Sequence, residues 1–251
     1  MVRLCIHEEL MEIRRFFALP EDIAGDKIYI SGEEFSHMKV LRQKVGYRVV
    51  VCTGDGKDYE GTVSEIKADH AVIKIDDVKD NENDPAFDIT LFQALPKGDK
   101  MSLIVQKCTE LGARKIIPFL SEFTEETKFN LERMQRVAKE ACKQCGRSLI
   151  CEVGELCSFS DVPDMLKDYD CVIMPYENAT TGNIGEVKGL DKARKIAVII
   201  GSEGGFSEKE VNLAKNSGAE IVSLGKRILR CETAGLVTIA LIAYEKGELG
   251  R

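Results

Sequence analysis

Glycines and acids are concentrated in one segment near the C-terminus, IAVIIGSEGGFSEKE. A continuous apolar run leads into a turn that contains Gly201, Gly204 and Gly205. Ser207 and Glu210 follow as an S-x-x-E capping box, which predicts the start of a helix. Glycine lets the backbone approach a ligand closely or adopt a positive φ. Because α/β proteins bind ligands beyond the carboxyl ends of parallel strands, this segment predicts a ligand-binding turn.

A second segment, SLGKRILRCETAG, has the same layout of a strand that ends in glycine, a loop and a helix. Lys226, Arg227 and Arg230 make the loop basic. Glu232 and Thr233 fall in the first turn of the predicted helix, where an acid suits the helix dipole. A solvated surface loop has a similar composition, but two such loops at strand ends favour a binding site.

Two common nucleotide-binding motifs do not fit the glycine-rich turn, which taken alone is more often structural than functional. A Walker A loop ends in Lys followed by Ser or Thr, and that ending is missing. A dinucleotide fold needs the spacing G-x-G-x-x-G and an acid about 20 residues further on. The sequence has Ser223, Leu224 and Gly225 in that neighbourhood. A nucleotide-dependent enzyme of the Rossmann type is therefore disfavoured.

Alternating strands and helices must position these turns. Strands with nearly continuous apolar sequence predict a parallel sheet that is covered on both faces. The predicted strands are 88–95, 115–120, 170–174, 195–200 and 220–224, and the predicted helices are 99–111, 131–145, 207–216 and 231–244.

The N-terminal part has a different pattern, which predicts a small β-barrel. Its expected strands are 27–30, 48–52, 59–66 and 71–75, and its expected helix is 33–41, with Ser31 as the cap. The acidic sequence DDVKDNEND at 76–84 is the predicted linker. We therefore expect a barrel domain at 1–80 and a second domain at 86–251.

The composition suits a folded protein of one or two domains. The 251 residues are 44% hydrophobic and 31% charged, with a net charge of −7. That charge opposes nucleic-acid binding, but residues 35–54 contain no acid and carry Lys39, Arg42, Lys44 and Arg48. Screening limits the reach of distant charges to about 10 Å, so such a stripe can still contact phosphates. A solvated protein face would carry the same charges.

Neither a metal site nor a membrane segment is expected. Cys142 and Cys145 form a single C-x-x-C pair, whereas four-thiolate zinc sites usually have two pairs separated by a longer loop. The longest apolar run near the C-terminus is too short for a bilayer, which needs about 20 residues. The N-terminus lacks the apolar core of a secretory signal, so we expect a cytoplasmic protein.

Taken together, these segments resemble the RsmE family of 16S ribosomal RNA (uracil-N3) methyltransferases, which belongs to the SPOUT class of knotted methyltransferases. The matching segments are IGSEGGFSEKEV, SLGKRILRCETA, QALPKGDKMSLIVQKCTELG, RRFF and HMKVLRQKVGY. The resemblance extends over residues 14–245. It implies an N-terminal PUA-like β-barrel and a C-terminal α/β domain whose chain end forms a trefoil knot.

The resemblance also implies partners and a cofactor. S-adenosylmethionine would bind at the knot, the substrate would be 16S rRNA or the small ribosomal subunit, and two copies would form a homodimer. The final apolar helix offers Leu236, Ile239, Ala240 and Ala243 as a packing face. A non-catalytic RNA-binding ribosome-assembly factor on the same fold is the alternative. Intact Gly204, Gly205 and Arg230 oppose it, because an inactive relative is free to lose them.

Residue roles follow from the same resemblance. The loops that would surround the cofactor are 174–177, 200–205 and 224–229. The cofactor-binding candidates are Met174, Pro175, Ile200, Gly201, Glu203, Gly204, Gly205, Leu224, Gly225, Ile228 and Leu229. The RNA-contact candidates are Arg14, Arg15, His37, Arg42, Lys97 and Lys107.

Uridine N3 carries a proton that must leave before the nitrogen is methylated. A cation near O2 or O4 would stabilise the resulting anion, and electrostatic help of this kind is often the largest catalytic effect. Arg230 is the candidate for that cation. Glu203 and Glu232 are the candidate proton acceptors, and the sequence does not choose between them.

The sequence departs from the family pattern at three places. Ser202 stands where the family usually has proline, which predicts a less rigid turn. Cys142 and Cys145 replace small residues of other types, which favours a role without metal. Residues 1–10 are predicted to be an extension, so that either Met1 or Met11 is the natural start.

Overall fold

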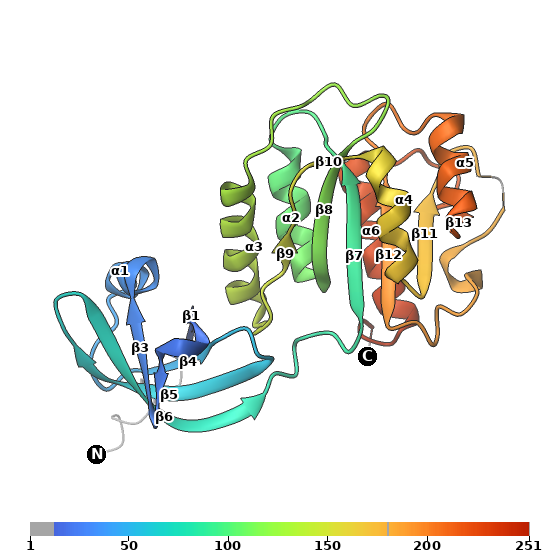
Figure 1. Ribbon diagram of the computed structural model, residues 1–251. Coiled ribbons are helices and arrows are strands. Elements are labelled where there is room, and N and C mark those ends of the chain that lie inside the picture. The colour runs from blue at the N-terminus through green and yellow to red at the C-terminus, as the bar shows by residue number, and fades with distance from the viewer. Residues whose placement is uncertain (1–12, 180, 251) are drawn as a thin grey trace, which may run out of the picture. The chain divides into compact units, whose positions relative to one another are not determined.

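The computed structural model describes residues 13–179 and 181–250, so the question of Met1 or Met11 lies outside the described residues. The chain divides into two compact units. Unit 1 holds the described residues up to Asp84 together with Gly146–Leu149. Unit 2 holds Pro85–Cys145 and the described residues from Ile150 onward. Figure 1 shows the strands and helices of each.

Unit 1 is, within the described residues, a six-stranded sheet in the order β1-β4-β5-β6-β3-β2. The β1 strand is parallel to β4, and the other neighbouring strands are antiparallel. The elements are β1 (Arg14–Phe17), η1 (Pro20–Asp22), β2 (Ile23–Ala24), β3 (Lys27–Ser31), α1 (Gly32–Val40), β4 (Arg48–Cys52), β5 (Lys57–Ile66) and β6 (His70–Asp80).

Alternating side chains of these strands meet in one hydrophobic core, because successive residues of a strand point to opposite faces. The α1 helix adds Phe35 and Met38 to this core. The buried strand residues are Phe16, Ile28, Ile30, Val49, Val51, Val63, Ala71 and Ile73. The RRFF sequence thus forms a strand that the sequence did not predict, with its two phenylalanines buried.

One sequence prediction for this unit is wrong. Residues 76–80 are part of β6 and not of a linker, because Asp77 to Asp80 pair with β5. Ladder hydrogen bonds there outweigh the low strand propensity of aspartate, and Lys79 Nζ lies 2.9 Å from Glu60 Oε1 across the strands. Ser31 is the N-cap residue of α1, as expected, but its side chain makes no capping hydrogen bond to the helix.

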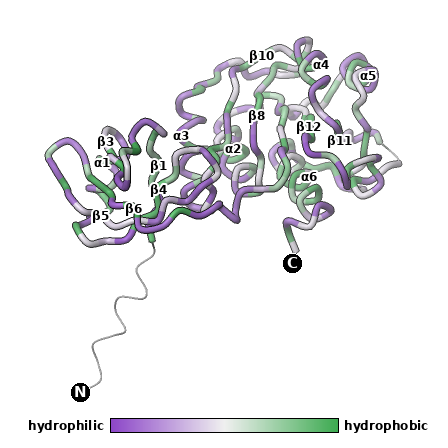
Figure 2. The backbone as a smooth tube through the Cα atoms, turned by 60° about the horizontal axis from the view of Figure 1, so that its bottom comes forward, coloured by the Kyte–Doolittle hydropathy of each residue, from purple (hydrophilic) through white to green (hydrophobic). Residues whose placement is uncertain are grey.

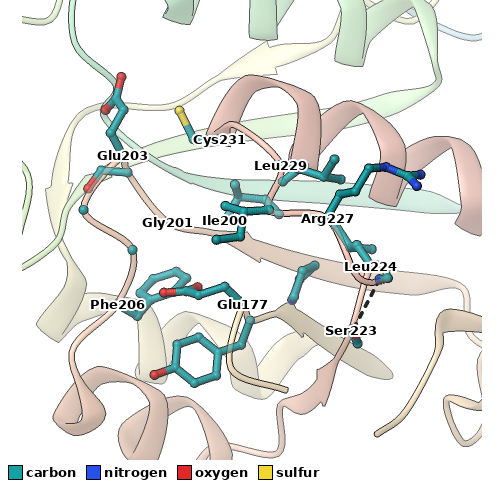
Figure 3. Close-up of a pocket in the computed structure, with 18 of the residues that line it drawn as sticks. Glu177, Ile200, Gly201, Glu203, Phe206, Ser223, Leu224, Arg227, Leu229 and Cys231 are labelled. Carbon is teal, nitrogen blue, oxygen red and sulfur yellow. Dashed lines mark hydrogen bonds between the residues drawn. The ribbon is translucent and has the colours of Figure 1, made fainter. Parts of the chain in front are cut away.

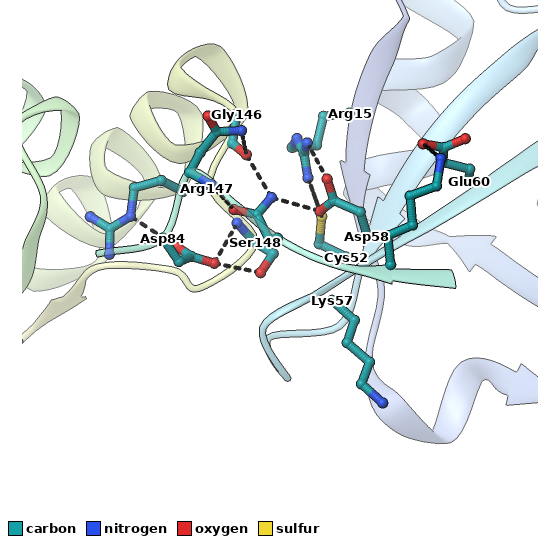
Figure 4. Close-up of polar contacts among 12 residues, drawn as sticks. Arg15, Cys52, Lys57, Asp58, Glu60, Asp84, Gly146, Arg147 and Ser148 are labelled. Atoms are coloured by element: carbon teal, nitrogen blue, oxygen red, sulfur yellow. Dashed lines mark hydrogen bonds and ion pairs between the residues drawn. The ribbon is translucent and has the colours of Figure 1, made fainter. Parts of the chain in front are cut away.

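The segment Gly146–Leu149 is attached to unit 1 mainly through the Asp84 carboxylate (Figure 4). This carboxylate accepts hydrogen bonds from Arg147 Nε at 3.2 Å and from Ser148 Oγ at 2.6 Å. The backbone N–H groups of Ser148 and Leu149 also donate to it. The Asp84 and Arg147 side chains are only 7% and 2% exposed, so a charged pair is held inside unit 1.

A second polar group in unit 1 joins β1 to β5 (Figure 4). The Arg15 guanidinium donates to both Asp58 carboxylate oxygens, at 2.5 and 2.8 Å, and its side chain is 12% exposed. Burial raises the pKa of Asp58, but hydrogen bonds from Arg15 and Asn81 outweigh it and lower that pKa overall. Burial also raises the pKa of the neighbouring Cys52 thiol to about 12. Arg15 is therefore engaged inside the unit.

Unit 2 is an α/β fold around an all-parallel sheet, as the sequence predicted. Its strand order is β10-β8-β7-β12-β11-β13, with β9 also paired to β8. The strands are β7 (Asp88–Ala94), β8 (Ala113–Leu120), β9 (Glu152–Val153), β10 (Cys157–Ser158), β11 (Cys171–Pro175), β12 (Lys195–Ile200) and β13 (Glu220–Val222). The trefoil knot stays a prediction.

Helices cover both faces of this sheet (Figure 1). Ala197 and Ile199 of β12 pack into the core cluster on the face of α4 and α5, and Gly235 of α6 packs near Leu91 and Ile200 on the other. The helices are α2 (Lys100–Glu110), α3 (Leu131–Cys145), α4 (Val162–Met165), α5 (Glu208–Asn216) and α6 (Cys231–Glu245), with 3-10 helices η2 (Phe159–Asp161), η3 (Leu166–Asp168) and η4 (Ile184–Glu186).

The start of α5, which follows β12, is formed by the residues that the sequence predicted. The Ser207–Glu210 capping box is confirmed, since each residue's backbone N–H donates to the other's side chain.

The cysteines of the C-x-x-C pair make ordinary hydrogen bonds. Cys142 Sγ accepts from the Cys151 N–H, and Cys145 Sγ donates to the Cys142 carbonyl. Among the described residues, no cluster of His, Cys, Asp or Glu suits a metal ion. None of the described helices has the length and apolar character needed to cross a membrane.

Candidate functional site

A pocket opens at the carboxyl ends of three neighbouring strands of unit 2, namely β12, β11 and β13 (Figure 3). Its volume of about 340 Å³ lies within the usual range for small-molecule sites. The lining residues are Pro175, Tyr176, Glu177, Ile200, Gly201, Ser202, Glu203, Gly204, Gly205, Phe206, Ser223, Leu224, Gly225, Lys226, Arg227, Ile228, Leu229, Cys231 and Ala234.

The glycine-rich turn after β12 forms one wall, and side chains are excluded there. Gly205 has φ +68°, and a Cβ on it would lie 2.5 Å from Glu177 Oε1. A Cβ on Gly204 would lie 2.6 Å from the Phe123 Cβ. The Gly205 N–H donates to the Ser202 carbonyl at 3.0 Å and closes the turn, and Ser202 Oγ donates to the Phe123 carbonyl. Phe123 and Glu177 therefore pack closely against this turn, which has no room for a side chain at Gly204 or Gly205.

The basic loop after β13 forms the opposite wall (Figure 3). Its start is fixed by Ser223, whose hydroxyl accepts the Gly225 N–H at 3.2 Å. Lys226 and Arg227 bring positive charge to the pocket, and Ile228 is 88% exposed. Small-molecule sites typically combine such apolar walls with a few polar groups that fix the orientation of the ligand.

Glu203 connects the pocket to a charged cluster beside it. Its carboxylate accepts from Lys100 Nζ at 2.5 Å and from the Lys97 N–H at 3.2 Å. Burial raises the pKa of Glu203, but the Lys100 hydrogen bond and the backbone bonds outweigh it, so that pKa is lowered overall. Glu232 Oε2 lies 3.9 Å from Lys100 Nζ and 3.3 Å from Cys231 Sγ. Burial raises the pKa of this thiol to about 12.

The structure brings together all the cofactor-binding candidates except Met174. Met174 is fully buried in the hydrophobic core on the α4 and α5 face, since it precedes the end of β11. Of the catalytic candidates, Glu203 lines the pocket. Arg230 is the exposed N-cap residue of α6, and Glu232 stands one residue after the pocket residue Cys231.

Several residues of this site were not foreseen. Phe206 and Ala234 line the pocket just beyond the predicted loops. Lys100 was not identified because its place beside Glu203 depends on β7 pairing with β12, which are about a hundred residues apart in the chain. The only local signal was its position at the start of a helix that follows a strand.

The RNA-contact candidates divide between the two units. In unit 1, Arg14 and Arg42 are exposed, His37 packs edge-on against Phe16 with ring centroids 5.9 Å apart, and Arg15 is engaged with Asp58. The engagement of Arg15 argues against RNA contact by that residue. In unit 2, the remaining candidates are half-exposed or exposed lysines that pair with acids, Lys97 with Glu125 and Lys107 with Glu110.

Family models match both units of the chain. An RNA methyltransferase domain matches residues 82–243, and an RNA methyltransferase PUA domain matches residues 30–76. Since the first match covers more than half of the chain, it identifies the family.

Individual relatives agree with these models. The ribosomal RNA small subunit methyltransferase E of Bacillus subtilis is 31% identical over 86% of this chain and 89% of its own length. The protein of the same name from Aquifex aeolicus is 30% identical over 88% of this chain and 96% of its own length. A crystal structure of ribosomal RNA small subunit methyltransferase E from Neisseria gonorrhoeae, bound to S-adenosyl methionine, is 28% identical and covers 95% of this chain and 100% of its own, with a TM-score of 0.83. These matches confirm the resemblance seen in the sequence.

Proposed function

The chain belongs to the RNA methyltransferase family that includes ribosomal RNA small subunit methyltransferase E, and we propose that it methylates N3 of a uridine in 16S rRNA with S-adenosylmethionine. The observation that carries this proposal is the pocket at the ends of β11, β12 and β13, formed by the segments that resemble the family. We place the protein in the cytoplasm, where its ribosomal substrate is found.

The residues present fit S-adenosylmethionine. Ile200, Leu224 and Leu229 offer apolar contacts for a flat adenine, and the glycine-rich turn contributes backbone atoms to the pocket lining. Glu177, which lines the same pocket, places a carboxylate where it can balance the positive charge of this cofactor. When bound, the cofactor supplies a methyl group on a sulfonium centre.

The reaction releases one proton. The N3–H bond of uridine breaks, a bond from N3 to the methyl carbon forms, and the carbon–sulfur bond breaks. Glu203, which lines the pocket and is held by Lys100, is the group that accepts the proton in this proposal, whereas Glu232 lies against the Cys231 thiol. Arg230, exposed at the N-cap of α6, stays a candidate for stabilising the uridine anion or for holding a phosphate.

Unit 1 positions the RNA in this proposal. Arg14, His37 and Arg42 are its candidate contacts, and Lys97 and Lys107 add contacts from unit 2. Phosphate contacts of this kind release counterions, which makes RNA affinity fall with salt.

A direct experiment separates this function from its alternatives. The protein is titrated calorimetrically with S-adenosylmethionine and with NAD, and then incubated with unmodified 16S rRNA and with small subunits. We expect binding of S-adenosylmethionine and the appearance of N3-methyluridine by mass spectrometry. Cofactor binding without methylation of either substrate would contradict the proposed methyltransferase activity. RNA binding without cofactor binding would indicate a non-catalytic assembly factor, and NAD binding would indicate an enzyme of the Rossmann type.

We also propose a homodimer through α6, whose sequence is hydrophobic around its circumference (Figure 2). Ile239 and Ala243, expected at the interface, are buried within their own unit. The outward residues are Leu241 and Tyr244, which are 40% and 61% exposed. A helix that is apolar all round needs cover on every side.

Light scattering tests the dimer. The protein is expected to have twice its 27.9 kDa chain mass at micromolar concentration, and Leu241→Glu is expected to shift it to the monomer because the substitution buries a charge. A monomer before any substitution contradicts the proposal. Leu213→Glu, at a similarly exposed position on α5, serves as the control and should leave the mass unchanged.

A further inference from the structure

Glu203 and its partners form a charged wall beside the candidate cofactor pocket. In Figure 3 the Glu203 carboxylate points away from Gly201 and Phe206, out of the pocket. It meets Lys100 Nζ at 2.5 Å, and both side chains are 29% exposed. An acceptor and a donor are thus held side by side, within reach of solvent, at the edge of the place where the cofactor fits.

An aromatic side chain forms a second wall near the same turn. Phe123 is 47% exposed, although it packs directly against Gly204. It lines a recess with Glu122, Thr124, Glu125 and Gly204, and Gly204 also lines the cofactor pocket. Gly204 therefore borders both the recess and the pocket.

Lys97 connects the two walls. Its backbone N–H donates to the Glu203 carboxylate at 3.2 Å, and its Nζ lies 2.7 Å from Glu125 Oε2 in the recess. One residue thus holds the charged pair and the aromatic loop together.

We propose that this recess is the subsite for the target uracil, with the ring stacked on Phe123 and its N3 edge facing the Glu203–Lys100 pair. The inference rests on the proposed function and names the part of the site that holds the methyl acceptor. Every nucleobase can stack on an aromatic ring, so stacking on Phe123 would contribute affinity without distinguishing the bases. The charged pair would then select uracil.

The hydrogen-bonding pattern of the pair matches uracil. N3–H is a donor flanked by two carbonyl oxygens, so Glu203 can accept from N3 while Lys100 donates to the neighbouring oxygen. Cytosine has a lone pair at N3, which would face the carboxylate and be repelled. A site that hydrogen-bonds a substrate N–H rejects analogues lacking it strongly, because its own polar groups lose their partner.

Lys100 acts here as a positioning residue for Glu203. The groups that face Glu203 are Lys100 from α2, the Lys97 N–H from the preceding loop, and Glu232 and Cys231 from α6. Of these, the Lys100 ammonium and the Lys97 N–H favour the charged carboxylate. Lys100 therefore keeps Glu203 ready to accept the N3 proton and holds its direction.

The sequence provides a clean optical test, because it contains no tryptophan. Phe123→Trp places a single tryptophan in the recess, and Leu213→Trp places one on α5 at a position 37% exposed. Each variant is loaded with S-adenosylmethionine and titrated with oligouridylate and with oligocytidylate of equal length. We expect the oligonucleotides to quench the tryptophan fluorescence only in the Phe123→Trp variant, and oligouridylate to quench it more strongly than oligocytidylate. Equal quenching at both positions, or no quenching at 123, overturns the subsite.

Kinetics complete the test. Phe123→Ala is expected to lower kcat/KM for RNA by about 10- to 100-fold, with unchanged S-adenosylmethionine affinity. Lys100→Met is expected to lower kcat and to move the acid limb of its pH profile to higher pH, and Lys100→Arg should restore part of the rate. Native protein that methylates rRNA while these variants behave normally disproves the subsite alone. Native protein that methylates no rRNA disproves the proposed function itself.

Discussion

Gly205→Val is expected to weaken S-adenosylmethionine binding by about 100-fold or more. Gly205 has φ +68°, a conformation that costs a β-branched residue about 1–3 kcal/mol. Its new Cβ would also lie 2.5 Å from Glu177 Oε1, so that either the turn or Glu177 must move. Both effects displace the backbone that the ligand should meet. Isothermal titration with S-adenosylmethionine measures the loss.

Gly218→Val is the matched control. Gly218 has φ +91°, but nothing lies within 4 Å of a Cβ placed there, and it does not line the pocket. This variant carries the same kind of backbone strain, so a general loss of stability would appear in both proteins. Equal cofactor affinity in the Gly205 variant and the native chain would remove the turn from the binding site.

Asp84→Ala is expected to lower the free energy of unfolding of unit 1 by about 3–5 kcal/mol, because it removes a buried carboxylate to which Arg147 and Ser148 both donate. The backbone N–H groups of Ser148 and Leu149 lose their acceptor at the same time. Urea unfolding, followed by circular dichroism, measures the change.

A surface ion pair provides the comparison. Asp164 pairs with Lys167 at 2.7 Å, but the two side chains are 83% and 75% exposed. Solvent screens such exposed pairs, which contribute little to stability, so Asp164→Ala should barely shift the urea midpoint. If Asp84→Ala has an effect as small as that, the buried pair does not hold Gly146–Leu149 to unit 1.

The long elements of unit 2 were predictable because their patterns are local. The β12 strand is apolar on both faces, and the Ser207–Glu210 box marks the next helix. The two-residue strands β9 and β10 are too short to show a period, so the sequence did not predict them. The β1 strand was missed for a different reason, because it depends on pairing with the distant strand β4.

The sequence predicted which loops form the site better than it predicted which side chains of those loops line it. Glycine positions pointed to the turn after β12, and the family resemblance supplied the other loops. Met174 was misplaced because one residue along a strand reverses the direction of a side chain. The Lys100–Glu203 pair needed the strand order, which places two distant segments side by side.

The attachment of Gly146–Leu149 to unit 1 has a consequence for the order of folding during synthesis. Domains are generally completed from the N-terminus as the chain leaves the ribosome. Here the Asp84 carboxylate receives its partners only after α3 has been made, because Arg147 and Ser148 follow that helix. A nascent chain that stops before residue 146 should therefore hold an incomplete unit 1, and a fragment cut after residue 84 would carry the same defect.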